Sequence, residues 1–272
     1  LLLDYIFLPL LSYLLIGIYM SEYFPTIHAW VWVAGSIALV TFLNLIGIES
    51  ITRVNWILVV VQLVFIVVFV GLSINNLAGQ SAPVSLLAPF HHEGFSVPLI
   101  MTGAAVLCLS FLGFDAVSTL AEECRDARRD VPRAIILTTL FAGLLFTLLA
   151  YVSQLVLPGS SFANADAAAN EVMFKAGGQF LTNFFTAAYV AGSLGSALAS
   201  QAAVSRILFT MGRDKVLPQR TFGYLSPRFG TPVFAILLVS AFSLLALVID
   251  LATLASLISF GALVAFSAVN LA

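Results

Sequence analysis

Long apolar stretches alternate with short polar segments along the whole 272-residue chain. Each stretch approaches or exceeds the ~20 residues that an α-helix needs to cross the ~30 Å hydrocarbon core of a bilayer. Lipid offers no partner for exposed backbone polar groups, so helices that satisfy these groups internally are the expected form. The sequence therefore predicts one all-α polytopic membrane domain, 1–272, with eight spans at 1–20, 27–48, 54–76, 97–121, 132–157, 179–209, 232–249 and 252–271.

The composition agrees with a protein whose solvent is lipid. Hydrophobic residues make up 61% of the chain and charged residues 9%, whereas soluble domains carry about 25% charged residues. A water-soluble fold of this size could not bury so much apolar surface. Because the sequence opens on Leu1 inside one apolar run and stops at Ala272 directly after another, we expect it to be a segment of a longer protein.

Positive charge is concentrated in alternate connections between the predicted spans. Three of these connections hold ten of the 11 Lys and Arg residues, and the others share only Lys175. Lys and Arg accumulate in cytoplasmic loops, so we expect these three connections, and with them both chain ends, on the cytoplasmic side of the plasma (inner) membrane. The ten residues are Arg53, Arg125, Arg128, Arg129, Arg133, Arg206, Arg213, Lys215, Arg220 and Arg228.

The fourth span, 97–121, carries an intramembrane carboxylate, Asp115, close to Gly113. Charged residues inside a membrane are costly and therefore mark functional sites. If the helix unwinds here, Asp115 can cap the half-helix that follows, and the freed carbonyl groups of 109–112 can bind a substrate ammonium. The alternative is a continuous helix in which Asp115 faces an aqueous cleft or a polar partner.

Three further polar features lie in the first, third and sixth spans. Asp4 is either an interfacial group or a buried anion for a cationic substrate, with Tyr5 adding a hydrogen bond or a cation–π contact. Gln62, in the middle of the third span, is expected to hydrogen-bond to another helix. The sixth span has faces of small residues that favour close helix packing, although they could instead line a substrate or ion path. Its relevant residues are Tyr189, Gly192, Ser193, Gly195, Ser196, Ala199, Ser200 and Ala203.

Enzyme motifs are missing from the sequence. It contains no P-loop, no nucleophile elbow and no zinc-binding His pair at helical spacing. Two intramembrane aspartates could suggest a membrane aspartyl protease, but Gly113-Phe114-Asp115 lacks the Gly-x-Gly-Asp context expected of that class. We therefore expect no enzyme activity, no cofactor, no metal site and no nucleic-acid partner.

Two blocks of sequence resemble amino acid–polyamine–organocation (APC) permeases. Residues 110–123 and 129–135 are similar to the sixth span of that family and the cytoplasmic run after it, although Asp126-Ala127 replaces the family's Asn-Pro. Residues 205–218 and 226–232 are similar to the loop after the eighth span and the start of the ninth. The resemblance extends over all eight spans, and it is closest to bacterial putrescine importers.

The resemblance implies a LeuT-like inverted-repeat fold in which the eight segments are spans three to ten of twelve and the fourth is discontinuous. Some relatives have a Lys where this chain has Gln62, so Asp115 is the better candidate for proton coupling, since burial can raise a carboxyl pKa towards neutrality. Gating or ion-path candidates are Gln62, Tyr189, Ser193 and Ser196. The implied substrate-binding residues are Asp4, Tyr5, Ser12, Leu109, Ser110, Phe111, Leu112, Gly113, Asp115, Ser259 and Phe260.

Together these features predict a secondary active transporter that imports an amino acid or a polyamine, with a putrescine-like substrate favoured. Proton symport with alternating access is the expected mechanism, so the expected partners are the substrate, the proton and the lipid bilayer. Two alternatives remain: an amino acid or amine exchanger of the same fold, and a non-transporting membrane receptor built like a permease.

Overall fold

The structure is a computed structural model that describes residues 2–47, 51–79, 85–90, 96–112, 126–158, 162, 164–227 and 229–271. At 2–5, 51–55 and 269 the description covers the backbone alone. Within these ranges the chain forms helices and connecting turns and no β-strand, so it is an all-α protein. The α-helices are α1 (Leu2–Tyr23), α2 (Ala29–Ile46), α3 (Ile51–Ala78), α4 (Val97–Leu107), α5 (Ala127–Val156), α6 (Ala168–Arg213), α7 (Gln219–Phe222), α8 (Val233–Ser243) and α9 (Leu251–Leu271).

Short 3-10 helices extend or join several of these elements. They are η1 (Ala88–Phe90), η2 (Cys108–Phe111), η4 (Ala165–Ala167) and η5 (Leu244–Leu247). Among the described residues, each of the eight apolar segments overlaps one of these α-helices. By length and composition, the helical segments able to cross a membrane within the described ranges are Ile6–Tyr23, Ala29–Ile46, Trp56–Ala78, Ala127–Val156 and Leu251–Ala268, and two shorter apolar helices run over Val97–Phe111 and Val233–Leu247.

The start of α5 shows how a capping residue sets a helix boundary. The apolar pattern begins at 132, but the helix begins at Ala127. The Asp126 carboxylate accepts a hydrogen bond from the backbone nitrogen of Arg129 at 3.3 Å, which satisfies one of the unpaired N–H groups of the first turn. The apolar pattern therefore marks the lipid-facing part of this helix, and the cap marks its beginning.

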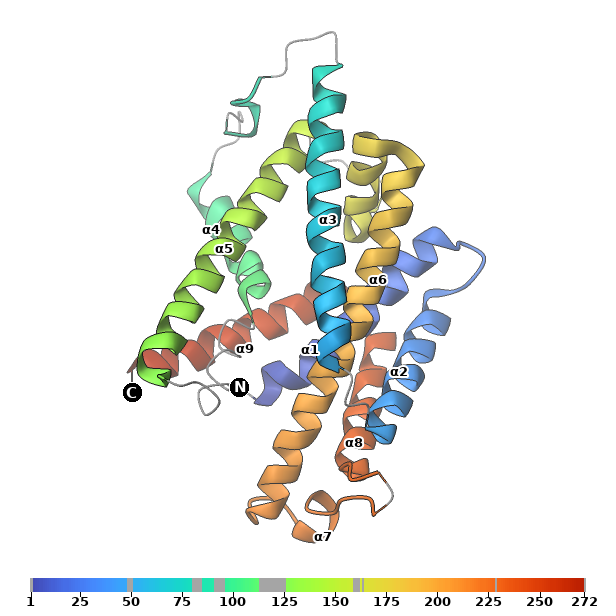
Figure 1. Cartoon of the computed structure of the whole chain (residues 1–272), viewed down its shortest axis with the longest axis vertical. Coiled ribbons are helices and arrows are strands. Elements are labelled where there is room, and N and C mark those ends of the chain that lie inside the picture. Colours follow the sequence, from blue (N-terminus) through green and yellow to red (C-terminus); the bar gives the residue numbers. More distant parts are fainter. Residues whose placement is uncertain are drawn as a thin grey trace.

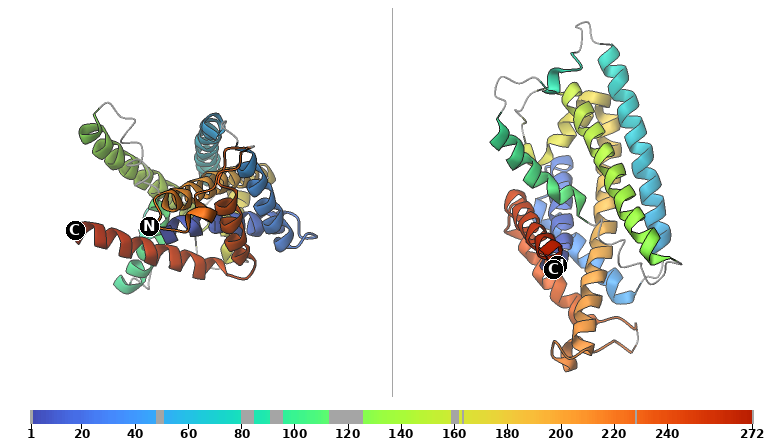
Figure 2. Two further views of the ribbon diagram at one scale, coloured as in Figure 1. Left: turned by 90° about the horizontal axis from the view of Figure 1, so that it is seen from below. Right: turned by 90° about the vertical axis from the view of Figure 1, so that its left-hand side faces the viewer.

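The long helix α6 lies at the centre of the bundle, with α1, α2, α3 and α8 against it (Figures 1 and 2). It consists of two helical parts, because the backbone leaves helical geometry at Gly177 and Gly178. Gly178 has φ +64°, a conformation that glycine adopts without the steric cost that other residues meet. The short first part, 168–176, therefore turns away from the long second part, 179–213.

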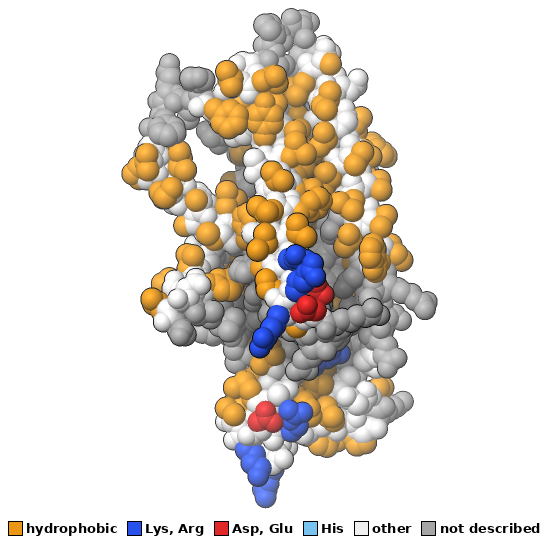
Figure 3. All heavy atoms as spheres, turned by 60° about the vertical axis from the view of Figure 1, so that its left-hand side comes forward, with side chains coloured by type: hydrophobic (Ala, Val, Ile, Leu, Met, Phe, Trp, Pro, Cys, Tyr) orange, Lys and Arg blue, Asp and Glu red, His pale blue; other side chains and the backbone are white. Residues whose placement is uncertain are grey.

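Large apolar side chains cover the outside of the bundle as well as its core. Leu144 of α5 is 73% exposed and Val67 of α3 is 72% exposed. Figure 3 shows apolar side chains spread over the helices of one face, with Lys and Arg confined to its lower half. In water such a surface would drive aggregation, whereas in a bilayer it is the expected contact with lipid. The fold is therefore that of an all-α polytopic membrane protein.

A buried chain of hydrogen bonds joins α1, α2, α6 and α8. The Tyr13 hydroxyl donates to Gln201 Oε1 at 2.6 Å, and Gln201 Nε2 donates to Ser240 Oγ at 2.7 Å. Ser240 Oγ in turn lies 2.7 Å from Thr41 Oγ1. Tyr13 and Gln201 are fully buried, so these bonds form away from solvent. The sequence did not predict this network, because its four residues lie far apart along the chain and only the packing of the helices brings them together.

The described part of the fourth span leaves helical geometry before Gly113. Its α-helix ends at Leu107, η2 follows, and Leu112 has an extended backbone with φ −61° and ψ 138°. A second half-helix after this point stays a prediction. Gly113 and Asp115 lie outside the described residues.

Removing Gln201 should destabilise the bundle. Gln201→Leu keeps the side-chain size but leaves the buried Tyr13 hydroxyl without its acceptor, and we expect a loss of about 1–3 kcal/mol in the free energy of unfolding. Tyr13→Phe should cost a similar amount, and the double variant less than the sum of the two, because both remove the same bond. Unfolding of the full-length protein in detergent measures this. Fully additive losses would show that the two side chains do not interact.

Gly212 is expected to be required for the packing of α7. A Cβ at this position would lie 2.5 Å from the Cβ of Phe222 and 2.7 Å from the backbone nitrogen of Gly223, so the end of α6 and α7 would have to separate. We predict that Gly212→Ala lowers the melting temperature of the full-length protein in detergent. Gly35→Ala on α2 is the matched control, since a Cβ there meets nothing within 4 Å. An unchanged melting temperature for Gly212→Ala would contradict this close contact.

Candidate functional site

A cavity of about 500 Å³ lies among α1, α3, α5 and α6. We call it the central cavity. Most of its lining is apolar or aromatic, as is usual for a small-molecule site, with a few polar groups at one wall. Those polar residues are Ser12 of α1, Gln62 of α3 and Tyr189, Ser193 and Ser196 of α6. The structure thus brings five sequence-predicted site residues from three helices to one cavity.

Helical spacing explains why α6 supplies so much of this wall. Tyr189, Gly192, Ser193 and Ser196 are three or four residues apart, and therefore share one face of the helix. An adjacent face, further along the helix, is close-packed and consists of Ala197, Gln201, Val204, Ser205 and Leu208, all of which are buried. The small-residue stripe that includes Gly192 and Ser196 therefore lines a cavity, and at Gly192 it also allows Gln62 of α3 to approach closely, as expected of a packing face.

Gln62 reaches across the central cavity to α6. Its Nε2 is so close to Gly192 that a Cβ there would lie 2.8 Å from it. No hydrogen bond joins the Gln62 amide to another described residue, contrary to the expected bond between helices. The amide is exposed in the cavity wall, so its donors and acceptor can serve a solute.

An aromatic cluster lies at one end of the central cavity. The rings of Tyr19 and Tyr189 have centroids 4.5 Å apart, and Phe185 lies 5.5 Å from Tyr19 and 5.3 Å from Tyr189. Tyr19 was not among the predicted site residues. The signal was present, because Tyr19 follows Ser12 by seven residues, about two helical turns, and so lies on the same face of α1.

The interrupted segment η2 divides its side chains between two surroundings. Leu109 and Leu112 pack against the buried core that contains Leu10 and Tyr13, and the backbone N–H of Leu112 donates to the Leu109 carbonyl at 3.2 Å. Ser110 and Phe111 instead line a second cavity, of about 370 Å³, against α5. Phe146 lines both cavities, and its ring meets that of Phe111 edge to face at 5.7 Å. Residues 109–112, whose carbonyl groups are predicted to bind substrate, therefore lie next to the central cavity, with the side chain of Phe146 between them and it.

The remaining predicted residues lie elsewhere. Ser259 of α9 is buried, and its Oγ has no hydrogen-bond partner among the described residues. Phe260, the next residue, points to the outside and is 69% exposed. Asp4 and Tyr5 belong to the first turn of α1, where the description covers the backbone alone. The substrate roles of these residues, and of Asp115, stay predictions.

A solute-sized cavity with polar groups, among helices whose outer surface is apolar, is what membrane permeases present. The profile of the family described as amino acid permease matches residues 2–271. The chain therefore belongs to the amino acid permease family, in agreement with the APC resemblance of its sequence.

Individual relatives agree with this assignment. The chain is 40% identical to the low-affinity putrescine importer PlaP of Escherichia coli, over 99% of this chain and 60% of that protein. It is 28% identical to the branched-chain amino acid permease BcaP of Bacillus subtilis, over 86% of this chain and 49% of that protein. It is 32% identical to the vacuolar cationic amino acid transporter 4 of Arabidopsis thaliana, over 86% of this chain and 38% of that protein. The chain thus spans less than two thirds of each relative.

Filling the space beside Gln62 should impair the site without unfolding the protein. Gly192→Ala places a methyl group against the flexible end of the Gln62 side chain, which can move, so stability should change little. The displaced amide narrows the central cavity, and we expect a rise of about tenfold in the KM of uptake, the effect of about 1.4 kcal/mol. Gly71→Ala, on the same helix as Gln62 but with open space around it, should leave uptake unchanged. Equal uptake by the two variants would show that Gln62 and Gly192 do not line the path of the substrate.

Proposed function

We propose that the full-length protein is a secondary active permease that imports an amino acid or a polyamine. The observation that carries this proposal is the central cavity, in which hydroxyl and amide groups from three helices face one solute-sized space within the bilayer. Membership of the amino acid permease family supports the substrate class. The similarity to a putrescine importer favours a putrescine-like amine within that class.

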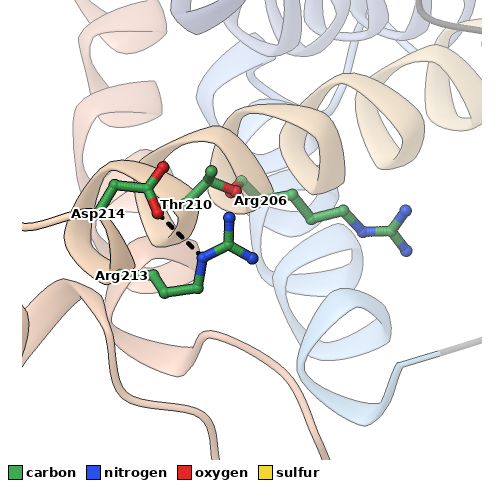
Figure 4. Close-up of polar contacts among 4 residues, drawn as sticks. All are labelled: Arg206, Thr210, Arg213 and Asp214. Carbon is green, nitrogen blue, oxygen red and sulfur yellow. Dashed lines mark hydrogen bonds and ion pairs between the residues drawn. The ribbon is translucent and has the colours of Figure 1, made fainter.

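The orientation we propose places the α7 end of the bundle in the cytoplasm. This end carries Arg206 and Arg213 of α6 (Figure 4), and Lys215 and Arg220 follow in the chain. The Arg213–Asp214 ion pair, at 3.1 Å, is formed by side chains that are 64% and 54% exposed, so it adds little stability. These basic residues therefore act chiefly through their summed positive charge, which favours retention on the cytoplasmic side.

Proton symport with alternating access is the coupling mechanism that we propose. Asp115 is the candidate carrier of the proton, because it follows the interrupted helix and a carboxyl group in an apolar setting binds protons more readily. Gln62 stands where some relatives have a Lys, and an amide does not titrate, so it can contribute hydrogen bonds but not proton coupling.

Uptake into proteoliposomes tests the proposal. With the full-length protein and an acidic outside, we expect accumulation of labelled putrescine above its equilibrium level, and collapse of the gradient should abolish it. Unlabelled putrescine, arginine and leucine, added in turn as competitors, identify the preferred substrate. Absence of amine and amino acid accumulation under the imposed gradient would refute the proposal.

The variant Asp115→Asn separates coupling from binding. It should lose accumulation driven by the pH gradient but keep exchange of internal for external substrate, because exchange needs no net proton movement. If the unmodified protein shows exchange alone, the function is that of an exchanger. Saturable binding without any flux would indicate a receptor.

A further inference from the structure

Another cavity with polar lining residues, distinct from the two described above, lies at the end of the bundle opposite α7 and has a volume of about 630 Å³. We call it the end cavity. It is formed by the last residues of α1, the end of α5 and both sides of the Gly177–Gly178 kink in α6. None of its lining residues was predicted as a site residue, so its chemistry is not accounted for by the central cavity.

Two carboxylates of the end cavity converge on one residue. Glu22 Oε2 accepts a hydrogen bond from Asn164 Nδ2 at 3.2 Å, and Glu171 Oε1 accepts one from the Asn164 backbone nitrogen at 3.5 Å. Lys175 is the one basic side chain in the lining, so the lining charge is −1. Two carboxylates that bind the same residue, in a lining of net negative charge, favour a cation nearby.

Uncharged groups of the lining favour the same kind of ligand. The Oδ1 of Asn170 is buried and has no hydrogen-bond partner among the described residues, which leaves an acceptor for a donor from outside the chain. Tyr23 and Phe174 add aromatic rings, whose faces attract ammonium groups. An organic ammonium ion only donates hydrogen bonds, so acceptors, carboxylates and rings together match its chemistry.

The end cavity and the central cavity adjoin along one face of α6. Gln179 and Thr182 line the former, Phe185 and Tyr189 line the latter, and their spacing of three or four residues keeps all four on one side of the helix. The aromatic cluster of Tyr19, Phe185 and Tyr189 lies at the junction. A solute that leaves the end cavity along α6 therefore meets these rings before it reaches the central cavity.

We infer that the end cavity is a capture site for aliphatic amines, which bind there before they enter the central cavity. The inference rests on the proposed import function, because the basic end of the bundle then faces the cytoplasm and the end cavity faces outwards. Glu22 and Glu171 attract the cation, and the aromatic rings hold its ammonium group. A zwitterionic neutral amino acid gains little from the carboxylates, so capture favours amines.

A labelling experiment tests the site independently of transport. In the full-length protein with its native cysteines replaced, Gln179→Cys puts a thiol in the lining of the end cavity. A cationic thiosulfonate should label it several-fold faster than a neutral reagent of similar size, and millimolar putrescine should slow the labelling. Both effects should disappear with Glu22→Gln plus Glu171→Gln. Equal rates for the two reagents, with no protection by putrescine, would overturn the inference even if uptake is normal.

Uptake kinetics provide the second test. At low ionic strength, Glu22→Gln and Glu171→Gln should each raise the KM for putrescine about tenfold, the lower end of the gain from a charged cleft, and leave kcat and the KM for leucine unchanged. Lys175→Gln should lower the KM for putrescine. Asp166 is a carboxylate near this end that does not line the cavity, so Asp166→Asn is the matched control. It should change neither the KM for putrescine nor the KM for leucine.

The outcomes of these tests separate the two proposals. If Asp166→Asn acts like Glu22→Gln, general surface charge explains the effect and the capture site is refuted. If the Glu variants impair putrescine and leucine uptake equally, the carboxylates are structural and the inference is wrong. Absence of all uptake by the unmodified protein would refute the import function instead, and the labelling rates would still decide whether the end cavity binds amines.

Discussion

The bundle depends on the buried hydrogen bonds of Gln201. Lipid chains are as apolar as leucine side chains, so the hydrophobic effect does little to hold one helix against another, and packing and interhelical hydrogen bonds take its place. Gln201 accepts from Tyr13 of α1 and donates to Ser240 of α8, and Ser240 contacts Thr41 of α2. Both polar atoms of the amide are satisfied, so its burial costs little. Four helices are thereby fixed around one point of α6.

Because one face of α6 is fixed in this way, its other face can border empty space. The buried residues from Ala197 to Leu208 anchor the helix, while Tyr189, Ser193 and Ser196 line the central cavity. The kink at Gly177 and Gly178 then turns the first part of the helix over the end cavity. A single helix thus forms part of both cavities and of the core, and the carboxylates of the end cavity are placed by the same backbone as the polar wall of the central cavity.

Hydropathy predicted the helical segments, and Gly113 predicted that the fourth one departs from helical geometry nearby, because apolar length and a helix-weakening stretch are local properties of the sequence. Polar positions in the apolar spans also named four residues of the central cavity, and the family resemblance named a fifth, Ser12. The sequence did not predict Gln201 as a structural residue, because whether a polar side chain finds partners depends on helices distant in sequence. The pairing of Glu22 with Glu171 was missed for the same reason: only the turn before α6 brings them together at Asn164.

Two glutamines illustrate how the same side chain can serve structure or function. Gln201 is fully buried and each of its polar atoms has a partner, so it has nothing left to offer a solute. Gln62 also lies in an apolar helix, but it is exposed, and its amide bonds to no described residue and lies against Gly192 at the cavity wall. An exposed amide without a protein partner keeps its donors and its acceptor for a solute. The unpaired amide of Gln62 is therefore the physical condition for a role in binding, as the full satisfaction of Gln201 is the condition for holding the helices together.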